Sequence, residues 1–282
     1  MWFTMRFLIT GCEGQLGKAF ISKLGLGINI KRLSKKEMDI TDPIKIEQQI
    51  QSFQPDYVIH TAAYTAVDLS EKHPILALQV NAIGTLHLAR ACKKYGAKLV
   101  FFSSDYVFDG EKNTPYIESD RPNPKNNYGL SKWLAEEFIL QTLPESYIIR
   151  TSWLFGDGEN NFVNTIKKNA YKRKPLKVIN DQIGSPTYTY DLVEACIPLL
   201  QLPFGIYHIR NDGICSWYSF AQTIYEECGT DPTLITPVTS KEYKTLAKRP
   251  SYSVLSMNKL KSSGTKLPRF WKEALCNFIN KE

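Results

Sequence analysis

The chain has little of what membrane-spanning, disulfide-stabilised or metal-binding proteins are built from. Its 282 residues contain no apolar run near the roughly 20 residues that cross a bilayer. The six cysteines are widely spaced, with no C-x-x-C pair and no histidine at metal-ligand spacing, which predicts reduced thiols in a cytoplasmic protein. No acidic cluster can be assigned to a metal ion, so none is expected. The apolar start, MWFTMRFLIT, lacks a basic segment and a cleavage site, and we interpret it as a first strand rather than a signal peptide.

A dense basic stripe is also missing. The formal net charge is +7, but the 35 lysines and arginines are spread along the chain, with only short clusters such as Lys35-Lys36. Nucleic-acid binding usually needs a denser stripe, so no nucleic-acid partner is expected. The excess charge suits a small anionic substrate, and it suits a solvated surface equally well.

What is present is a regular alternation of two kinds of segment. Runs rich in β-branched and aromatic residues predict buried strands at 6–10, 57–61, 98–103, 147–151 and 176–179. Helical spacing appears between them at 16–24, 44–52, 74–95 and 128–143. This order predicts an α/β fold, a Rossmann-type doubly wound parallel sheet with right-handed crossovers.

A glycine-rich turn follows the first strand and leads directly into a helix. The segment Gly11-Cys12-Glu13-Gly14-Gln15-Leu16-Gly17 has G-x-x-G-x-x-G spacing. Gly11 suits a tight exit from the strand, Gly14 a close approach of backbone N–H groups to a pyrophosphate, and Gly17 close packing of helix on strand. The turn, including Gln15 and Leu16, is therefore predicted to bind a dinucleotide. The alternative is a purely structural turn.

The end of the second strand bears on which dinucleotide is bound. This strand is expected at Asn29–Leu33, and no acidic residue follows it to hold a ribose diol. Arg32 or Lys35 can instead meet a 2'-phosphate, which favours NADPH, with NADH still possible; exposed side chains on a loop are the alternative. Asp39, with Ile40 beside it, is expected to meet the adenine, whereas Asp42 before a proline is expected to cap the next helix.

The candidate catalytic group is a Y-x-x-x-K pair at the start of a helix. Tyr128 and Lys132 are four residues apart, so their side chains share one helix face. An ammonium group nearby should lower the pKa of the phenol, and the tyrosine would act as a general acid. Ser104, at the end of the fourth strand, would hold the reacting carbonyl. The alternatives are a surface tyrosine with a solvated lysine, and paired serines that cap the next turn.

These motifs resemble those of the dTDP-4-dehydrorhamnose reductases, within the extended short-chain dehydrogenases, nearly end to end. The matching strings are GCEGQLG (11–17), MDITD (38–42), HTAAYTAVDLSE (60–71), SSDYVFDG (103–110), NNYGLSK (126–132), RTSWLFG (150–156), DQIGSPTYTYDL (181–192) and RPSYSVL (249–255). Family members often have threonine where Ser104 stands and usually have asparagine where His60 stands. We expect His60 to be a packing residue at a strand end.

The resemblance implies NAD(P)H-dependent reduction of the C4 keto group of dTDP-6-deoxy-L-lyxo-4-hexulose to dTDP-L-rhamnose, a polysaccharide precursor. It implies that Tyr128 donates the proton and that Lys132 holds the nicotinamide ribose. The residues that it places at the cofactor are Ala62, Ala63, Tyr64 and Thr65. The residues that it places at the sugar nucleotide are Ser104, Asp105, Trp153 and Asn161. Arg249 is expected at the substrate pyrophosphate, with a plain surface arginine as the alternative.

The same reasoning predicts how the chain is divided. Residues 1–152 are expected to form the NAD(P)-binding Rossmann domain, with later segments returning to it. Residues 153–282, where the alternation loosens and short helices are expected at 220–228 and 270–280, should form mainly a smaller substrate-binding lobe. The rival functions are a related keto-sugar-nucleotide reductase, for example one that forms a 6-deoxytalose, and a non-catalytic regulatory subunit. The sequence leaves open whether the protein is a monomer or a homodimer.

Overall fold

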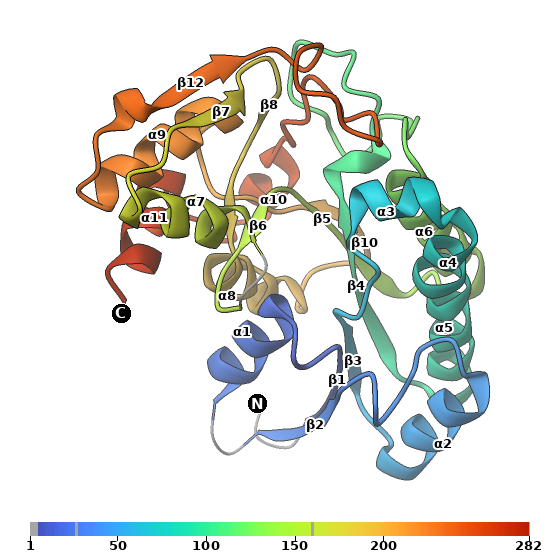
Figure 1. The fold of residues 1–282 in the computed structure, drawn as a ribbon. Helices are drawn as coiled ribbons and strands as arrows, with labels where there is room; N and C mark the ends of the chain where they lie inside the picture. The colour runs from blue at the N-terminus through green and yellow to red at the C-terminus, as the bar shows by residue number, and fades with distance from the viewer. Residues whose placement is uncertain (1–4, 26–27, 159–160, 282) are drawn as a thin grey trace.

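The computed structural model describes residues 5–25, 28–158 and 161–281, and its centre is a six-stranded parallel sheet (Figure 1). The strand order is β10-β5-β4-β3-β1-β2, and every pairing between neighbours is parallel. The strands are β1 (Arg6–Thr10), β2 (Asn29–Leu33), β3 (Tyr57–His60), β4 (Lys98–Ser104), β5 (Ser146–Thr151) and β10 (Gly205–His208). This confirms the predicted fold class.

Helices cover both faces of the sheet because alternate strand residues point to opposite sides. Phe7 and Ile9 pack with α1 (Gln15–Leu24) and α8 (Thr189–Leu199), which lie together on one face. Leu8 packs on the opposite face, against α2 (Pro43–Phe53), α5 (Gly84–Tyr95) and α6 (Asn127–Thr142). Both faces are therefore closed, as a parallel sheet requires.

The chain reverses direction across the sheet at β1, which lies between β2 and β3. In doubly wound sheets a crevice opens at such a point, at the carboxyl ends of the strands, and ligands bind there. The glycine turn after β1 and the loop after β3 lie on the two sides of this crevice. The topology thus brings two of the predicted motifs to one edge.

The long helix predicted at 74–95 is interrupted by a π-helical turn. It consists of α4 (Pro74–Leu78), the turn η1 (Gln79–Ile83) and α5, and a shorter helix, α3 (Val67–Lys72), precedes it. By length and composition alone this 22-residue run could span a membrane, but half of its most apolar window is buried. Leu88, Ala89 and Cys92 belong to the core beneath the sheet, so we interpret it as a core helix.

A second core lies beyond the carboxyl edge of the sheet (Figure 1). It is formed by α7 (Phe162–Tyr171), β7 (Leu176–Ile179), α9 (Trp217–Glu227), β12 (Ile235–Val238) and α11 (Trp271–Ile279). β7, which the sequence predicts as a strand, pairs with β12 and not with the large sheet. Conversely, β10 and α8 come from the second half of the chain and belong to the sheet layer.

The remaining elements are short. They are η2 (Asp105–Val107), β6 (Leu154–Phe155), β8 (Ile183–Gly184), β9 (Thr187–Tyr188), β11 (Cys215–Ser216), η3 (Pro232–Leu234) and α10 (Asn258–Ser262). β6 pairs with β9, and β8 pairs with β11. Predicted and observed helix ends differ by at most three residues. α9, for example, begins at Trp217 rather than at 220, because Ser216 caps it through the Ser219 N–H.

Candidate active site

Two cavities adjoin each other at the carboxyl edge of the sheet, and Tyr128 lines both. The smaller cavity, of about 480 Å³, lies against the glycine turn. The larger, of about 820 Å³, lies between the sheet edge and the second core. Thr65 and Leu154 also line both cavities. The geometry therefore offers two compartments that share one phenol.

The glycine turn has the close contacts that its spacing predicts. Gly11 has a positive φ of +64°, and a Cβ there would lie 2.7 Å from the Ala62 backbone. A Cβ on Gly17 would lie 2.5 Å from the carbonyl oxygen of Gly11, which would push α1 away from the turn. Gly14, Gln15, Leu16 and Gly17 line the smaller cavity at the beginning of α1. Backbone N–H groups at a helix N-terminus are suited to bind phosphate there.

The opposite wall of the smaller cavity consists of the loop after β3 and the ends of β4 and β5. Its residues include Thr61, Ala62, Ala63, Ser103 and Thr151. Three residues that line this cavity have a buried polar atom with no hydrogen-bond partner in the part of the chain that the structure describes: Gln15 Oε1, Ser103 Oγ and Thr151 Oγ1. Because buried polar groups are normally paired, these atoms indicate a polar ligand.

Five predicted cofactor residues do not line the smaller cavity: Gly11, Arg32, Asp39, Ile40 and Tyr64. Arg32 is exposed and pairs in register with Ile9, close to the turn. The Asp39 carboxylate is less available to an adenine than predicted, since its Oδ1 accepts from both the backbone N–H and the hydroxyl of Thr41. Asp42 caps α2 as expected, by accepting from the Ile44 and Lys45 N–H groups.

Local contacts at the start of α6 place Tyr128 at the junction of the cavities. Asn126 caps the helix by accepting from the Gly129 N–H at 2.7 Å. A Cβ on Gly129 would lie 2.1 Å from the carbonyl oxygen of Tyr106, so only glycine allows α6 to approach the loop after β4 this closely. Lys132 is 3% exposed, and its Nζ lies 4.1 Å from the ring centroid of Phe101. A solvated lysine is therefore ruled out.

The pKa of Tyr128 is the point at which the sequence reasoning was wrong. We expected Lys132 to lower it, but burial raises the pKa of Tyr128 to about 12, and the Asp105 carboxylate raises it as well. A hydrogen bond with Ser104 lowers it only in part. Burial also lowers the pKa of Lys132 to about 7, against the opposing effect of Glu136. Tyr128 thus holds its proton at neutral pH.

Ser104 and Asp105 reach the larger cavity from the end of β4. The Ser104 hydroxyl donates to Asp105 Oδ1 at 3.0 Å and accepts from the Tyr106 N–H at 3.1 Å, so it also caps η2. Asp105 is 2% exposed, and burial raises its pKa to about 7. Hydrogen bonds with Ser253 and Ser104 oppose this rise in pKa. Asp105 lines the larger cavity, and its buried Oδ2 makes no hydrogen bond of normal geometry with the residues that the structure describes. Both side chains can therefore bind a polar ligand.

Aromatic side chains form the far wall of the larger cavity. The rings of Trp153 and Trp217 stack at 3.5 Å between centroids, and Phe162 lies 4.5 Å from Trp217. Trp153 has a positive φ of +46°. A Cβ on Gly184 would lie 2.5 Å from its indole, so Trp153 is held between Gly184 and Trp217. The indole is therefore closely packed against both neighbours.

The two other predicted substrate residues have partners within the protein. Arg249 lines the larger cavity, but its guanidinium forms two hydrogen bonds with the Asp68 carboxylate, at 2.8 and 3.1 Å. Asn161 caps α7 by accepting from the Asn164 N–H and donates to the Gly156 carbonyl oxygen. It lines neither cavity. The structure thus brings Arg249, but not Asn161, to Ser104 and Tyr128.

Sequence reasoning missed several lining residues, above all Trp217 and Thr151. Trp217 lies outside every matching string, and Thr151 lies within RTSWLFG (150–156) but without a predicted role. Each reaches its cavity through long-range strand pairing: β8 with β11, and β4 with β5. In the described ranges, no three histidine, cysteine or acidic side chains gather in a way that could hold a metal ion.

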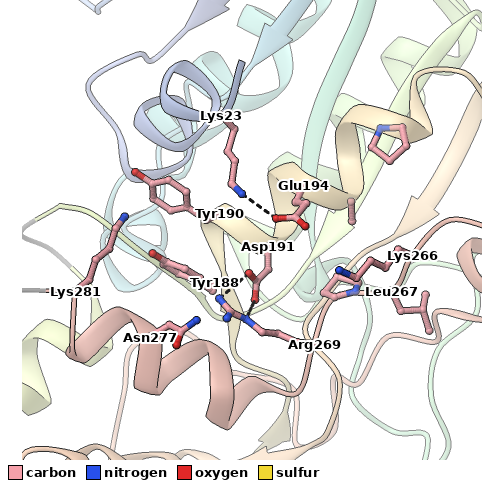
Figure 2. A pocket seen from close by; sticks show the side chains of 13 residues that line it. Lys23, Tyr188, Tyr190, Asp191, Glu194, Lys266, Leu267, Arg269, Asn277 and Lys281 are labelled. Carbon is pink, nitrogen blue, oxygen red and sulfur yellow. Dashed lines mark hydrogen bonds and ion pairs between the residues drawn. The ribbon is translucent and has the colours of Figure 1, made fainter. Parts of the chain in front are cut away.

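A third cavity, of about 640 Å³, lies elsewhere, between α1, α8 and the segment before α11 (Figure 2). Its charges are largely paired across elements: Lys23 with Glu194 at 2.8 Å, and Arg269 with Asp191 at 2.9 Å (Figure 2). The predicted site residues are absent from its walls. Because the ion pairs join α8 to α1 and to the C-terminal segment, we interpret this region as structural.

Known proteins share this arrangement. Residues 5–282 match the family described as RmlD substrate binding domain. The chain is 46% identical to the spore coat polysaccharide biosynthesis protein SpsK of Bacillus subtilis (97% of this chain, 96% of that protein). It is 37% identical to the dTDP-4-dehydrorhamnose reductase of Streptomyces griseus (96% and 91%). A crystal structure of dTDP-4-dehydrorhamnose reductase from Bacillus anthracis in complex with NADP matches with a TM-score of 0.95 and 39% identity, over 99% of both chains. The chain therefore belongs to the RmlD substrate binding domain family, that of the dTDP-4-dehydrorhamnose reductases.

Proposed function

We propose that this protein is a dTDP-4-dehydrorhamnose reductase, which reduces the C4 keto group of dTDP-6-deoxy-L-lyxo-4-hexulose to dTDP-L-rhamnose with NADPH. The observation that carries the proposal is the pair of cavities that share Tyr128, one beside a dinucleotide-type turn and one beside Ser104 and Asp105. The near full-length similarity to reductases of that name supports the choice of substrate.

The smaller cavity fits a nicotinamide dinucleotide. The glycine turn leaves its backbone open where a Cβ would collide, and three lining residues have buried polar atoms without a hydrogen-bond partner among the described residues. We assign the pyrophosphate to Gly14–Gly17, the loop contact to Ala62, Ala63 and Thr65, and the ribose to Lys132. Arg32, at the end of β2, would meet the 2'-phosphate, in keeping with NADPH. When bound, the cofactor supplies the hydride.

The protein's own part in the reaction is to orient the sugar and deliver a proton. The Ser104 hydroxyl, which donates to Asp105 Oδ1 in this structure, would turn to donate its hydrogen bond to the keto oxygen, which places that oxygen beside the phenol. Tyr128 is protonated at neutral pH because its pKa is raised to about 12, so it can act as the general acid. The phenolate that remains would be stabilised by Lys132 in its charged form. Trp153, fixed between its neighbours, would limit the orientation of the sugar.

The same assignment indicates which part of the molecule binds each ligand. We infer that the sheet layer, with β10 and α8 returned to it, holds the cofactor, and that the second core holds the sugar nucleotide. The protein would act in the cytoplasm on a small-molecule substrate. Association into a homodimer stays a prediction.

The test is absorbance of NADPH, and in parallel NADH, in the presence of dTDP-4-keto-6-deoxyglucose and its 3,5-epimerase. We expect oxidation of NADPH by the wild type and a loss of about 10²- to 10⁴-fold in Tyr128→Phe. The product should be dTDP-L-rhamnose by chromatography and NMR. A 6-deoxytalose product would replace this proposal with the epimeric reductase, and absence of oxidation with intact NADP⁺ binding would remove the substrate assignment.

A further inference from the structure

His60 lies at the end of β3, with 2% of its surface exposed, on the wall of the smaller cavity. Both ring nitrogens are within hydrogen-bond distance of a hydroxyl. Nδ1 lies 2.8 Å from Thr10 Oγ1, and Nε2 lies 3.0 Å from Thr85 Oγ1. The ring therefore connects β1, β3 and α5 at the point where the cofactor is expected to bind.

The directions of these hydrogen bonds follow from their neighbours. Thr85 donates its hydroxyl proton to the Asn81 carbonyl oxygen at 2.6 Å, so it must accept from His60 Nε2–H. A neutral ring then accepts at Nδ1 from the Thr10 hydroxyl. The neutral form is the one that burial favours, since burial lowers the pKa of His60 to about 3. One tautomer thus satisfies every group.

The chain of hydrogen bonds continues from His60 to the catalytic helix. Asn81, in the π-helical turn, accepts from the Tyr64 N–H at 2.7 Å and donates to the Tyr64 carbonyl oxygen at 3.0 Å. Its amide also donates to Ser131 Oγ at 2.9 Å, and Ser131 donates to the carbonyl oxygen of Tyr128 at 2.7 Å. Thr85, Asn81 and Ser131 are each at most 1% exposed.

We propose that His60 is a positioning residue, which couples the wall of the cofactor cavity to the first turn of the helix that carries Tyr128. On one side it fixes Thr10, whose hydroxyl accepts from the Ala62 N–H in that wall. On the other side it fixes Thr85 and, through Asn81, both Tyr64 and the helix. Neither the hydrogen bonds through Thr10 nor those through Thr85 extend to the aromatic wall of the larger cavity. This inference rests on the proposed function of the two cavities.

The test removes one hydroxyl and keeps the shape of the core. Thr85→Val deletes the acceptor of His60 Nε2–H, and Thr85→Ser keeps it. Thr223→Val is the matched control, because Thr223 makes the same bond to the carbonyl oxygen four residues earlier, to Ser219 at 3.0 Å, in α9. His60→Gln and His60→Asn complete the set. Each variant is measured for NADP⁺ binding by calorimetry, for kcat and both KM values, and for Tm.

We expect Thr85→Val to raise the Kd for NADP⁺ about three- to tenfold and to lower kcat, with the KM of the sugar nucleotide unchanged. Thr85→Ser should restore both, and Thr223→Val should lower only Tm. If the histidine and Thr85→Val variants lose thermal stability but keep wild-type NADP⁺ affinity and kcat, His60 is a packing residue and the inference is overturned. Calorimetry needs no sugar substrate, so a wrong substrate assignment would leave this test intact.

Discussion

Replacement of Gly17 by alanine tests the dinucleotide site most directly. The new Cβ would lie 2.5 Å from the Gly11 carbonyl oxygen and 2.8 Å from the Cys12 Cα. Both are backbone atoms, so the contact is relieved only if α1 moves away from the turn. Overpacking of this kind costs about 1–3 kcal/mol, and we expect the free energy of unfolding to fall by that amount. Displaced N–H groups should also weaken NADP⁺ binding by about tenfold, the equivalent of about 1.4 kcal/mol.

The assay combines urea denaturation with calorimetric titration of NADP⁺. Gly14→Ala is the matched control, because its Cβ would have a single contact within 4 Å, with the Gly11 carbonyl oxygen at 3.3 Å. Gly14→Ala should weaken NADP⁺ binding while the free energy of unfolding changes by less than about 0.5 kcal/mol. Wild-type NADP⁺ affinity in Gly17→Ala would refute the assignment of the turn to the pyrophosphate.

Three further predictions concern the other parts of the site. Lys132→Met should lower kcat by about 10²-fold or more, measured by NADPH absorbance, because the phenolate of Tyr128 loses its cation; near-normal turnover would exclude that role. Trp217→Ala should raise the KM of the sugar nucleotide about tenfold by releasing the Trp153 indole, with NADP⁺ affinity unchanged in calorimetry. An unaltered KM would contradict the role of Trp217 in holding Trp153. His60 has a pKa of about 3 in the folded chain, below its ordinary 6.5, so its contribution to stability is present above pH 6.5 and is lost as the pH falls toward 3. Between pH 7 and pH 5 the wild type should lose roughly 2 kcal/mol of unfolding free energy relative to His60→Gln, and equal slopes in urea titrations would refute a neutral buried ring.

Local patterns in the sequence predict the parts of this protein that depend on neighbouring residues. The G-x-x-G-x-x-G turn, the Asp42 cap and the Tyr128–Lys132 pair each concern positions within seven residues of one another, so backbone geometry alone relates them. Alternating strand and helix patterns likewise predict the parallel sheet, because parallel strands need helical crossovers. The similarity to a known family added the substrate, which no local pattern contains.

The tertiary structure decided what depends on contacts between distant segments. The Ser104 hydroxyl is within hydrogen-bond reach of Tyr128 only because Gly129 lets α6 approach Tyr106. Trp217 stacks on Trp153 only because β11 pairs with β8. Burial also reversed the expected change in the pKa of Tyr128, since desolvation in the folded chain and the neighbouring Asp105 carboxylate both raise it. Spacing along the chain fixes which groups share a turn or a helix face, whereas packing fixes how far each group is removed from water and which partners remain for it.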